Sequence, residues 1–166
     1  MQSQVGRYGP ETLRALSLWV VMNRAMASLS RKIEGDIRER GFSLTEWGVL
    51  EHLYHKGPQP MAKLGDQILV TGGSVTYVVD KLEKRGLVRR DPCQHDRRII
   101  YAVLTESGTH VMQDEFPKHA AKITSIMSVL NQEEQESVRE LLKRLGLSAA
   151  GKLDPDNKSA SERMSE

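Results

Sequence analysis

The chain has 166 residues, of which 39% are hydrophobic and 28% charged, a composition typical of one folded domain with appended helices. It contains no apolar run near the roughly 20 residues that cross a bilayer and no signal-peptide segment in residues 1–10, so we expect a cytoplasmic protein without a membrane partner. Its single cysteine, Cys93, excludes an intrachain disulfide and a cysteine-based metal cluster.

The net charge of +2 is distributed unevenly along the chain. Residues 60–104 contain eight lysines and arginines against five acidic residues, whereas residues 105–166 contain eight against eleven. A positive excess in the middle indicates a nucleic-acid-binding module there. The alternative is a solvated surface whose charge is merely uneven.

The first predicted element is a helix over residues 10–40. Its apolar residues recur at spacings of three and four, forming one stripe: Trp19, Met22, Met26, Leu29, Ile33 and Ile37. A helix of about 30 residues is roughly 45 Å long, which is more than one small domain covers, so we expect a partner on its apolar face. The alternative is a long core helix of a monomer.

Two shorter helices are predicted after the first one. Ser43 or Thr45 caps the second helix, which extends to about Lys56. Glycine and proline in residues 57–60 predict a turn, and a third helix covers residues 61–69.

A fourth helix is predicted over residues 71–85, with a threonine cap at its start and Gly86 at its end. Residues 87–91 and 98–104 are predicted to form two short strands. The polar residues 92–97 join them, which predicts a β-hairpin with a charged tip.

Two helices complete the chain. Thr105 caps the fifth helix, and Asn131 with Glu134 forms a capping-box start for the sixth. Gly146 is expected to stop that helix. The polar residues 148–166 predict a disordered tail.

Two short helices joined by a tight turn and followed by a hairpin are typical of a winged helix-turn-helix. The second helix of such a pair enters the major groove of DNA, which is about 12 Å wide. Its outward side chains are small, hydroxylated or cationic, so they suit close approach to phosphates and bases. These candidate DNA-binding residues are Thr71, Gly72, Gly73, Ser74, Thr76, Tyr77 and Lys81.

The hairpin supplies further candidates. Arg97 and Arg98 lie at its tip, where arginine suits a narrow minor groove. Asp96 is placed to orient one of these guanidinium groups through a bidentate pair. Arg89 and Arg90 on the preceding strand can reach backbone phosphates. The alternative is a solvated charged turn.

Residues 44–109 resemble the MarR family of multiple antibiotic resistance regulators. The resemblance is carried by Leu44-Thr45, by the segments 70–76 and 79–90, and by Leu104-Thr105-Glu106-Ser107-Gly108. The family's Asp-x-Arg signature falls on Asp96 and Arg98. With the flanking helices included, the resemblance covers about residues 10–145.

The resemblance implies a mainly helical fold with a small β wing and long dimerisation helices. Its parts would be an N-terminal dimerisation helix (1–40), the winged helix-turn-helix (41–104), C-terminal dimerisation helices (105–147) and a tail (148–166). It further implies a two-fold homodimer on double-stranded DNA at a pseudo-palindromic operator, usually as a repressor. Members often release DNA when a small aromatic, phenolic or quinone-like compound binds between the dimerisation and DNA-binding regions.

Parts of the sequence also fit functions other than DNA-binding regulation by an aromatic compound. Cys93 lies beside several cations, which favour its thiolate, so a redox-responsive regulator is one alternative. The pairs His52/His55 and His110/Asp114 have zinc-ligand spacing, but no third ligand joins either of them. No nucleophile motif or phosphate-binding loop is present, so we expect neither an enzyme nor a cofactor. A winged helix that binds protein instead of DNA is the remaining alternative.

Overall fold

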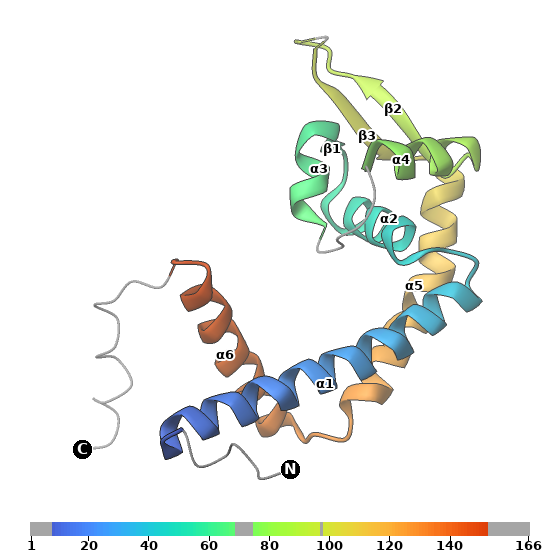
Figure 1. Cartoon of the computed structure of the whole chain (residues 1–166). Coiled ribbons are helices and arrows are strands. Elements are labelled where there is room, and N and C mark those ends of the chain that lie inside the picture. Colours follow the sequence, from blue (N-terminus) through green and yellow to red (C-terminus); the bar gives the residue numbers. More distant parts are fainter. Residues whose placement is uncertain (1–7, 69–74, 97, 153–166) are drawn as a thin grey trace, which may run out of the picture. The chain divides into compact units, whose positions relative to one another are not determined.

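The computed structural model describes residues 8–68, 75–96 and 98–152. The chain divides into two compact units after Ile123, and each unit is described separately below. Most described residues are helical and one small antiparallel sheet is present, which confirms the predicted mainly α fold with a β wing (Figure 1). No helix among the described residues is long and apolar enough to span a membrane.

Helix α1 (Pro10–Glu39) begins with proline in its first turn, as predicted. It ends at Arg40, after which Gly41 adopts a φ of 80°, a left-handed conformation that favours glycine. Only the last part of the helix reaches the core, through Asp36 and Ile37. Of the predicted apolar stripe, Trp19 and Met26 are exposed on this chain, Met22, Leu29 and Ile33 are half-buried, and Ile37 is buried.

Helix α2 (Leu44–Lys56) begins with a capping box. The Ser43 hydroxyl accepts a hydrogen bond from the Glu46 amide, and the Glu46 carboxylate accepts one from the Ser43 amide. Ser43 is thus the cap, and of the two predicted candidates Thr45 was wrong because the box needs glutamate three residues after the cap. The helix buries Trp47 completely in the core.

The sheet has three strands in the order β1-β3-β2. Strands β2 (Val88–Pro92) and β3 (Ile100–Leu104) form the predicted hairpin. Strand β1 (Gln59–Pro60) was missed, because the sequence predicted only a turn there; its two residues pair with Ala102 and Tyr101. Proline is tolerated on such an edge, where its missing N–H breaks no ladder.

Helices α3 (Met61–Gln67) and α4 (Val75–Lys84) lie between β1 and β2 in the chain. Residues 71–74, which we expected to open the fourth helix, lie outside the described residues. Gly86 follows α4 with a φ of 70°, as predicted for the residue that closes it. The core joins these helices to α2 and the sheet. Its most completely buried side chains are Ile37, Trp47, Val49, Leu50, Leu64, Val79, Leu82, Val88 and Met112.

Helix α5 (Glu106–Met127) is tied to the end of α4 at its first turn. The Thr105 hydroxyl donates to the Gly86 carbonyl at 2.6 Å and accepts from the Gly108 amide at 3.0 Å. A Cβ on Gly108 would lie 2.0 Å from the Leu87 carbonyl oxygen, so only glycine allows this approach.

Helix α6 (Gln132–Ala149) lies in the second unit. The predicted capping box of Asn131 and Glu134 is present. The predicted stop at Gly146 was wrong: the helix continues to Ala149, so residues 148 and 149 are helical and not part of the tail. A glycine inside an open helix costs only about 1 kcal/mol, and the chain turns at Gly151, where φ is 64°.

Candidate nucleic-acid interface

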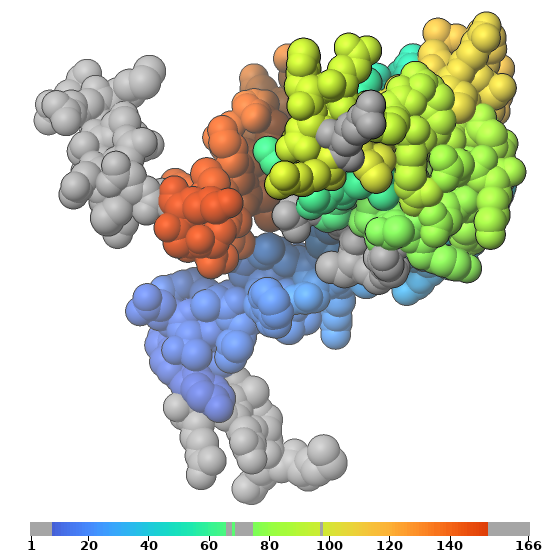
Figure 2. Space-filling view, turned by 90° about the horizontal axis from the view of Figure 1, so that it is seen from above, coloured from blue at the N-terminus to red at the C-terminus, as the bar shows by residue number. Residues whose placement is uncertain are grey.

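Helix α4 presents a polar face to solvent. Val78, Val79 and Leu82 are buried on its inner side, which exposes Thr76 and Tyr77 on the outer side. The Tyr77 side chain is 61% exposed. Viewed from above, α4 and the hairpin form one continuous part of the surface, coloured green to yellow-green (Figure 2). A helix with an open polar face beside a hairpin can enter a groove of DNA.

Lys81 links this outer face to the start of α2. Its Nζ lies 3.3 Å from Glu46 Oε1 and 5.8 Å from the centre of the Tyr77 ring. Burial opposes ionisation of Glu46, but hydrogen bonds from Ser43 and Lys81 outweigh it and lower the pKa of this carboxyl. The ionised carboxylate therefore holds Lys81 beside the exposed tyrosine.

The tip of the hairpin is shaped by Asp96. Its carboxylate accepts a hydrogen bond from the backbone amide of Arg98 at 3.0 Å, and its carbonyl accepts one from the Ile99 amide at 2.9 Å. We predicted that this carboxylate would pair with a guanidinium group, whereas the partner found among the described residues is the Arg98 backbone. The Arg98 side chain is exposed, and Arg97 lies outside the described residues.

The two arginines of β2 differ in their surroundings. Arg89 is exposed and pairs with Asp91 two residues further along the strand. Arg90 is only 25% exposed and forms ion pairs of 2.5 Å with both Asp80 and Glu83 of α4. These two acidic partners could not be found from the sequence, because nothing in the strand pattern tells which helix face the arginine meets.

Of the twelve predicted DNA-binding residues, the structure describes seven, and all of them lie on α4 or the hairpin: Thr76, Tyr77, Lys81, Arg89, Arg90, Asp96 and Arg98. The other five, Thr71, Gly72, Gly73, Ser74 and Arg97, lie outside the described residues.

A cavity of about 360 Å³ opens between α1, α2 and α5. Its walls include Ile33, Ile37, Trp47, Ile68 and His119. The indole Nε1 of Trp47 is buried and has no hydrogen-bond partner among the described residues. An unpaired buried donor is costly, and Trp47 is also one of the residues that line the cavity.

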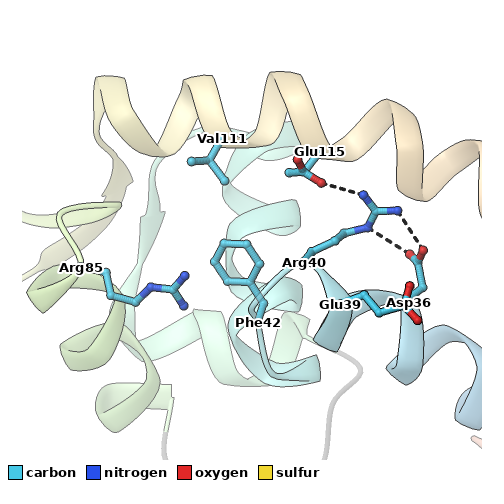
Figure 3. A pocket seen from close by; sticks show the side chains of 7 residues that line it. All are labelled: Asp36, Glu39, Arg40, Phe42, Arg85, Val111 and Glu115. Carbon is cyan, nitrogen blue, oxygen red and sulfur yellow. Dashed lines mark hydrogen bonds and ion pairs between the residues drawn. The ribbon is translucent and has the colours of Figure 1, made fainter.

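A second hollow of about 500 Å³ has charged walls (Figure 3). Arg40 lies at one end and hydrogen-bonds both Asp36 and Glu115, at 2.8 and 2.7 Å. At the other end the guanidinium of Arg85 lies 4.3 Å from the centre of the Phe42 ring. Three of the charged groups of this hollow, Arg40, Asp36 and Glu115, already bond one another.

Metal binding gains no support from the described part of the chain, where no three His, Cys, Asp or Glu side chains come together. Cys93 is half-buried at the start of the hairpin loop. Its backbone amide donates to the Ile99 carbonyl at 2.9 Å.

The comparisons with known proteins agree with this architecture. Residues 42–100 match the family model described as the MarR family. The chain is 46% identical over 138 residues to the HTH-type transcriptional regulator MhqR of Bacillus subtilis, a match that covers 83% of this chain and 95% of the relative.

Solved structures give the same fold. The MarR family regulator Sco3205 of Streptomyces coelicolor, solved in complex with DNA, superposes with a TM-score of 0.73 at 23% identity, covering 86% of this chain and 90% of that one. BpsR of Bordetella bronchiseptica, whose DNA binding is regulated by 6-hydroxynicotinic acid, superposes with a TM-score of 0.67 at 20% identity, covering 76% and 90%. The chain therefore belongs to the MarR family of DNA-binding transcriptional regulators, which are not enzymes.

Proposed function

We propose that this protein is a cytoplasmic, homodimeric repressor that binds a pseudo-palindromic operator and leaves it when a small aromatic compound binds. The observation that carries the DNA-binding part is the open polar face of α4 beside the exposed Arg98 of the hairpin. In the complex, Thr76, Tyr77 and Lys81 would meet the major groove. Arg98 would enter the neighbouring minor groove, where negative potential is high.

The dimer is supported by open apolar surface on both units. In α1, Leu16, Trp19 and Val20 are exposed at spacings of three and four, and Trp19 is 64% exposed. A monomer would leave such a stripe in water, so a second copy of the chain is its expected cover.

Helix α6 carries a second stripe of the same kind. Val138, Leu141, Leu142 and Leu145 recur at spacings of three, one and three on one helix face, and all four are exposed. Two copies related by a two-fold axis would place two α4 helices on one duplex, with half-sites about one helical turn apart.

The aromatic effector is supported by the cavity beside Trp47. Its walls combine apolar side chains with polar ones, among them His55 and His119, which suits a flat ring that carries a polar substituent. Because the cavity lies between α1, α2 and α5, a guest would act on the helices that orient the DNA-binding region. The regulation of BpsR by 6-hydroxynicotinic acid is a precedent within the fold.

The test uses the duplex that the native protein selects from a random-sequence pool. We expect its affinity to fall steeply between about 50 and 200 mM salt, as phosphate contacts require. A panel of phenols, quinones and aromatic acids is then added, and at least one class should release the DNA. Failure to select any duplex would refute the operator, whereas selection without release by the panel would refute only the effector.

A further inference from the structure

One arginine of the hairpin contacts α4 at three points. Arg90 Nη2 lies 2.5 Å from Asp80 Oδ1 and 3.4 Å from the Thr76 carbonyl oxygen. Its Nη1 lies 2.5 Å from Glu83 Oε2. The side chain is three-quarters buried by these contacts.

The three partners share one face of the helix. Thr76, Asp80 and Glu83 follow one another at spacings of four and three, so they lie in a row along α4. The planar guanidinium of Arg90 can bond two carboxylates at once, which an ammonium group cannot do in a fixed geometry. It therefore fixes both the distance of the strand from α4 and its direction.

The backbone of Arg90 is held as firmly as its side chain. Strand β2 pairs with β3 through the register Arg90↔Ala102, and Ala102 is completely buried. A contact made by Arg90 is therefore transmitted to both strands of the hairpin, which end at the loop that carries Arg98.

We infer that Arg90 is a positioning residue, which sets the angle between α4 and the hairpin so that Thr76 and Arg98 meet adjacent grooves together. This inference rests on the proposed binding of operator DNA. The positive charge of Arg90 faces two carboxylates and leaves the cluster of Arg90, Asp80 and Glu83 negative, so the cluster is not a phosphate site. Hydrogen bonding to Asp80 raises the pKa of Arg90, so the guanidinium stays charged.

The first test compares two neighbouring arginines on the selected duplex. Arg89→Gln removes a proposed phosphate contact, so the slope of log affinity against log salt should fall by about 0.9. Arg90→Gln should weaken binding about tenfold, since it removes a charge-assisted network, while the slope stays that of the native protein. A fall in slope equal to that of Arg89→Gln would overturn the inference.

The second test has a predicted sign. The alternative role for Arg90 is a phosphate contact that Asp80 and Glu83 weaken. In that case the double variant Asp80→Asn/Glu83→Gln should bind DNA more tightly, because it removes two negative charges beside a polyanion. The positioning role predicts weaker binding, with little further loss when Arg90→Gln is added. Tighter binding would overturn the inference.

A third measurement needs no DNA. Amide hydrogen exchange in residues 88–91 and 100–104 should become faster in Arg90→Gln and stay unchanged in Arg89→Gln. If the native protein selects no duplex, the operator proposal fails but this measurement still decides whether Arg90 holds the hairpin. If Arg90→Gln does not fold, Arg90→Lys replaces it and should show an intermediate exchange rate; native exchange in either variant would contradict the inference.

Discussion

His119 Nδ1 lies 2.7 Å from Asp36 Oδ2, and both side chains are buried although 83 residues separate them. Arg40 extends this contact by bonding Asp36 and Glu115 together. These four side chains join the end of α1 to α5. The Trp47 ring packs against His119, with 4.9 Å between the two ring centres. The same histidine lines the proposed effector cavity, so the contact between α1 and α5 borders the site where a ligand would act.

Asp36→Asn should destabilise the protein by about 3 kcal/mol at neutral pH, because it removes the buried negative charge and replaces one of the two acceptor oxygens with an NH2 donor. Burial alone would raise the pKa of Asp36, but hydrogen bonds from Arg40 and His119 lower it overall. A lowered folded-state pKa gives stability that is present above the ordinary aspartate pKa and is lost as the pH falls through the folded value.

The difference in unfolding free energy between native and Asp36→Asn proteins should therefore be constant near neutrality and shrink below about pH 4. Denaturant titration at several pH values measures it. Glu34→Gln, which removes an exposed ion pair with Arg38 in the same helix, is the control and should change stability by less than about 0.5 kcal/mol. A difference that grew on acidification would contradict this account.

Gly108→Ala should destabilise the first unit by about 3 kcal/mol, because its Cβ would lie 2.0 Å from the Leu87 carbonyl oxygen, a backbone atom that cannot move aside. Gly35→Ala in α1 is the matched control, since nothing lies within 4 Å of its Cβ. It should stabilise the helix by about 0.5–1 kcal/mol. Thermal unfolding of both variants measures the two effects. Equal unfolding midpoints would rule out the close approach of Gly108 to the Leu87 carbonyl.

Leu141→Glu should turn the proposed dimer into a monomer, because it places a charge in the apolar stripe of α6, where Leu141 is 54% exposed on the single chain. Lys143→Glu introduces the same side chain on the opposite face of that helix and should leave the dimer intact. Sedimentation equilibrium distinguishes the two. A Leu141→Glu protein that sedimented as a dimer would exclude this stripe from the interface.

Trp47→Phe should weaken release by the aromatic compounds that act on the native protein, since it replaces the indole that lines the cavity with a smaller ring. The cost in stability should be only about 1–2 kcal/mol, because no hydrogen bond is lost within the protein. Phe42→Leu, a buried substitution outside the cavity walls, is the control and should keep the response. Unchanged release by Trp47→Phe in fluorescence anisotropy would place the effector elsewhere.

Much of the fold could be predicted from local signals. Ser43 with Glu46 and Asn131 with Glu134 are capping pairs that need only four residues of sequence, and each begins a helix where expected. Gly86 likewise marks the end of α4. Gly146 misled the prediction because a glycine signals a helix end only where the chain turns, and tertiary context decided that.

The parts that could not be predicted depend on which elements meet. Gln59 lies in a segment that was expected to be a turn, but its pairing with Ala102 makes it part of a strand. The contact of Arg90 with Asp80 joins residues that look like separate surface charges in the sequence. The unpaired Nε1 of Trp47 is equally invisible, since the pattern shows that this residue is buried but not what surrounds its ring.

In the proposed complex, α4 lies against base pairs while Arg98 enters the adjacent minor groove, and this arrangement occurs twice on one duplex. Hydroxyl-radical footprinting of the selected duplex tests it most directly, with native protein and Arg98→Ala compared at saturation. We expect two protected half-sites about one helical turn apart, each flanked by a protected minor-groove segment that Arg98→Ala loses while the half-sites remain. A single half-site, or flanking protection that survives in Arg98→Ala, would contradict it.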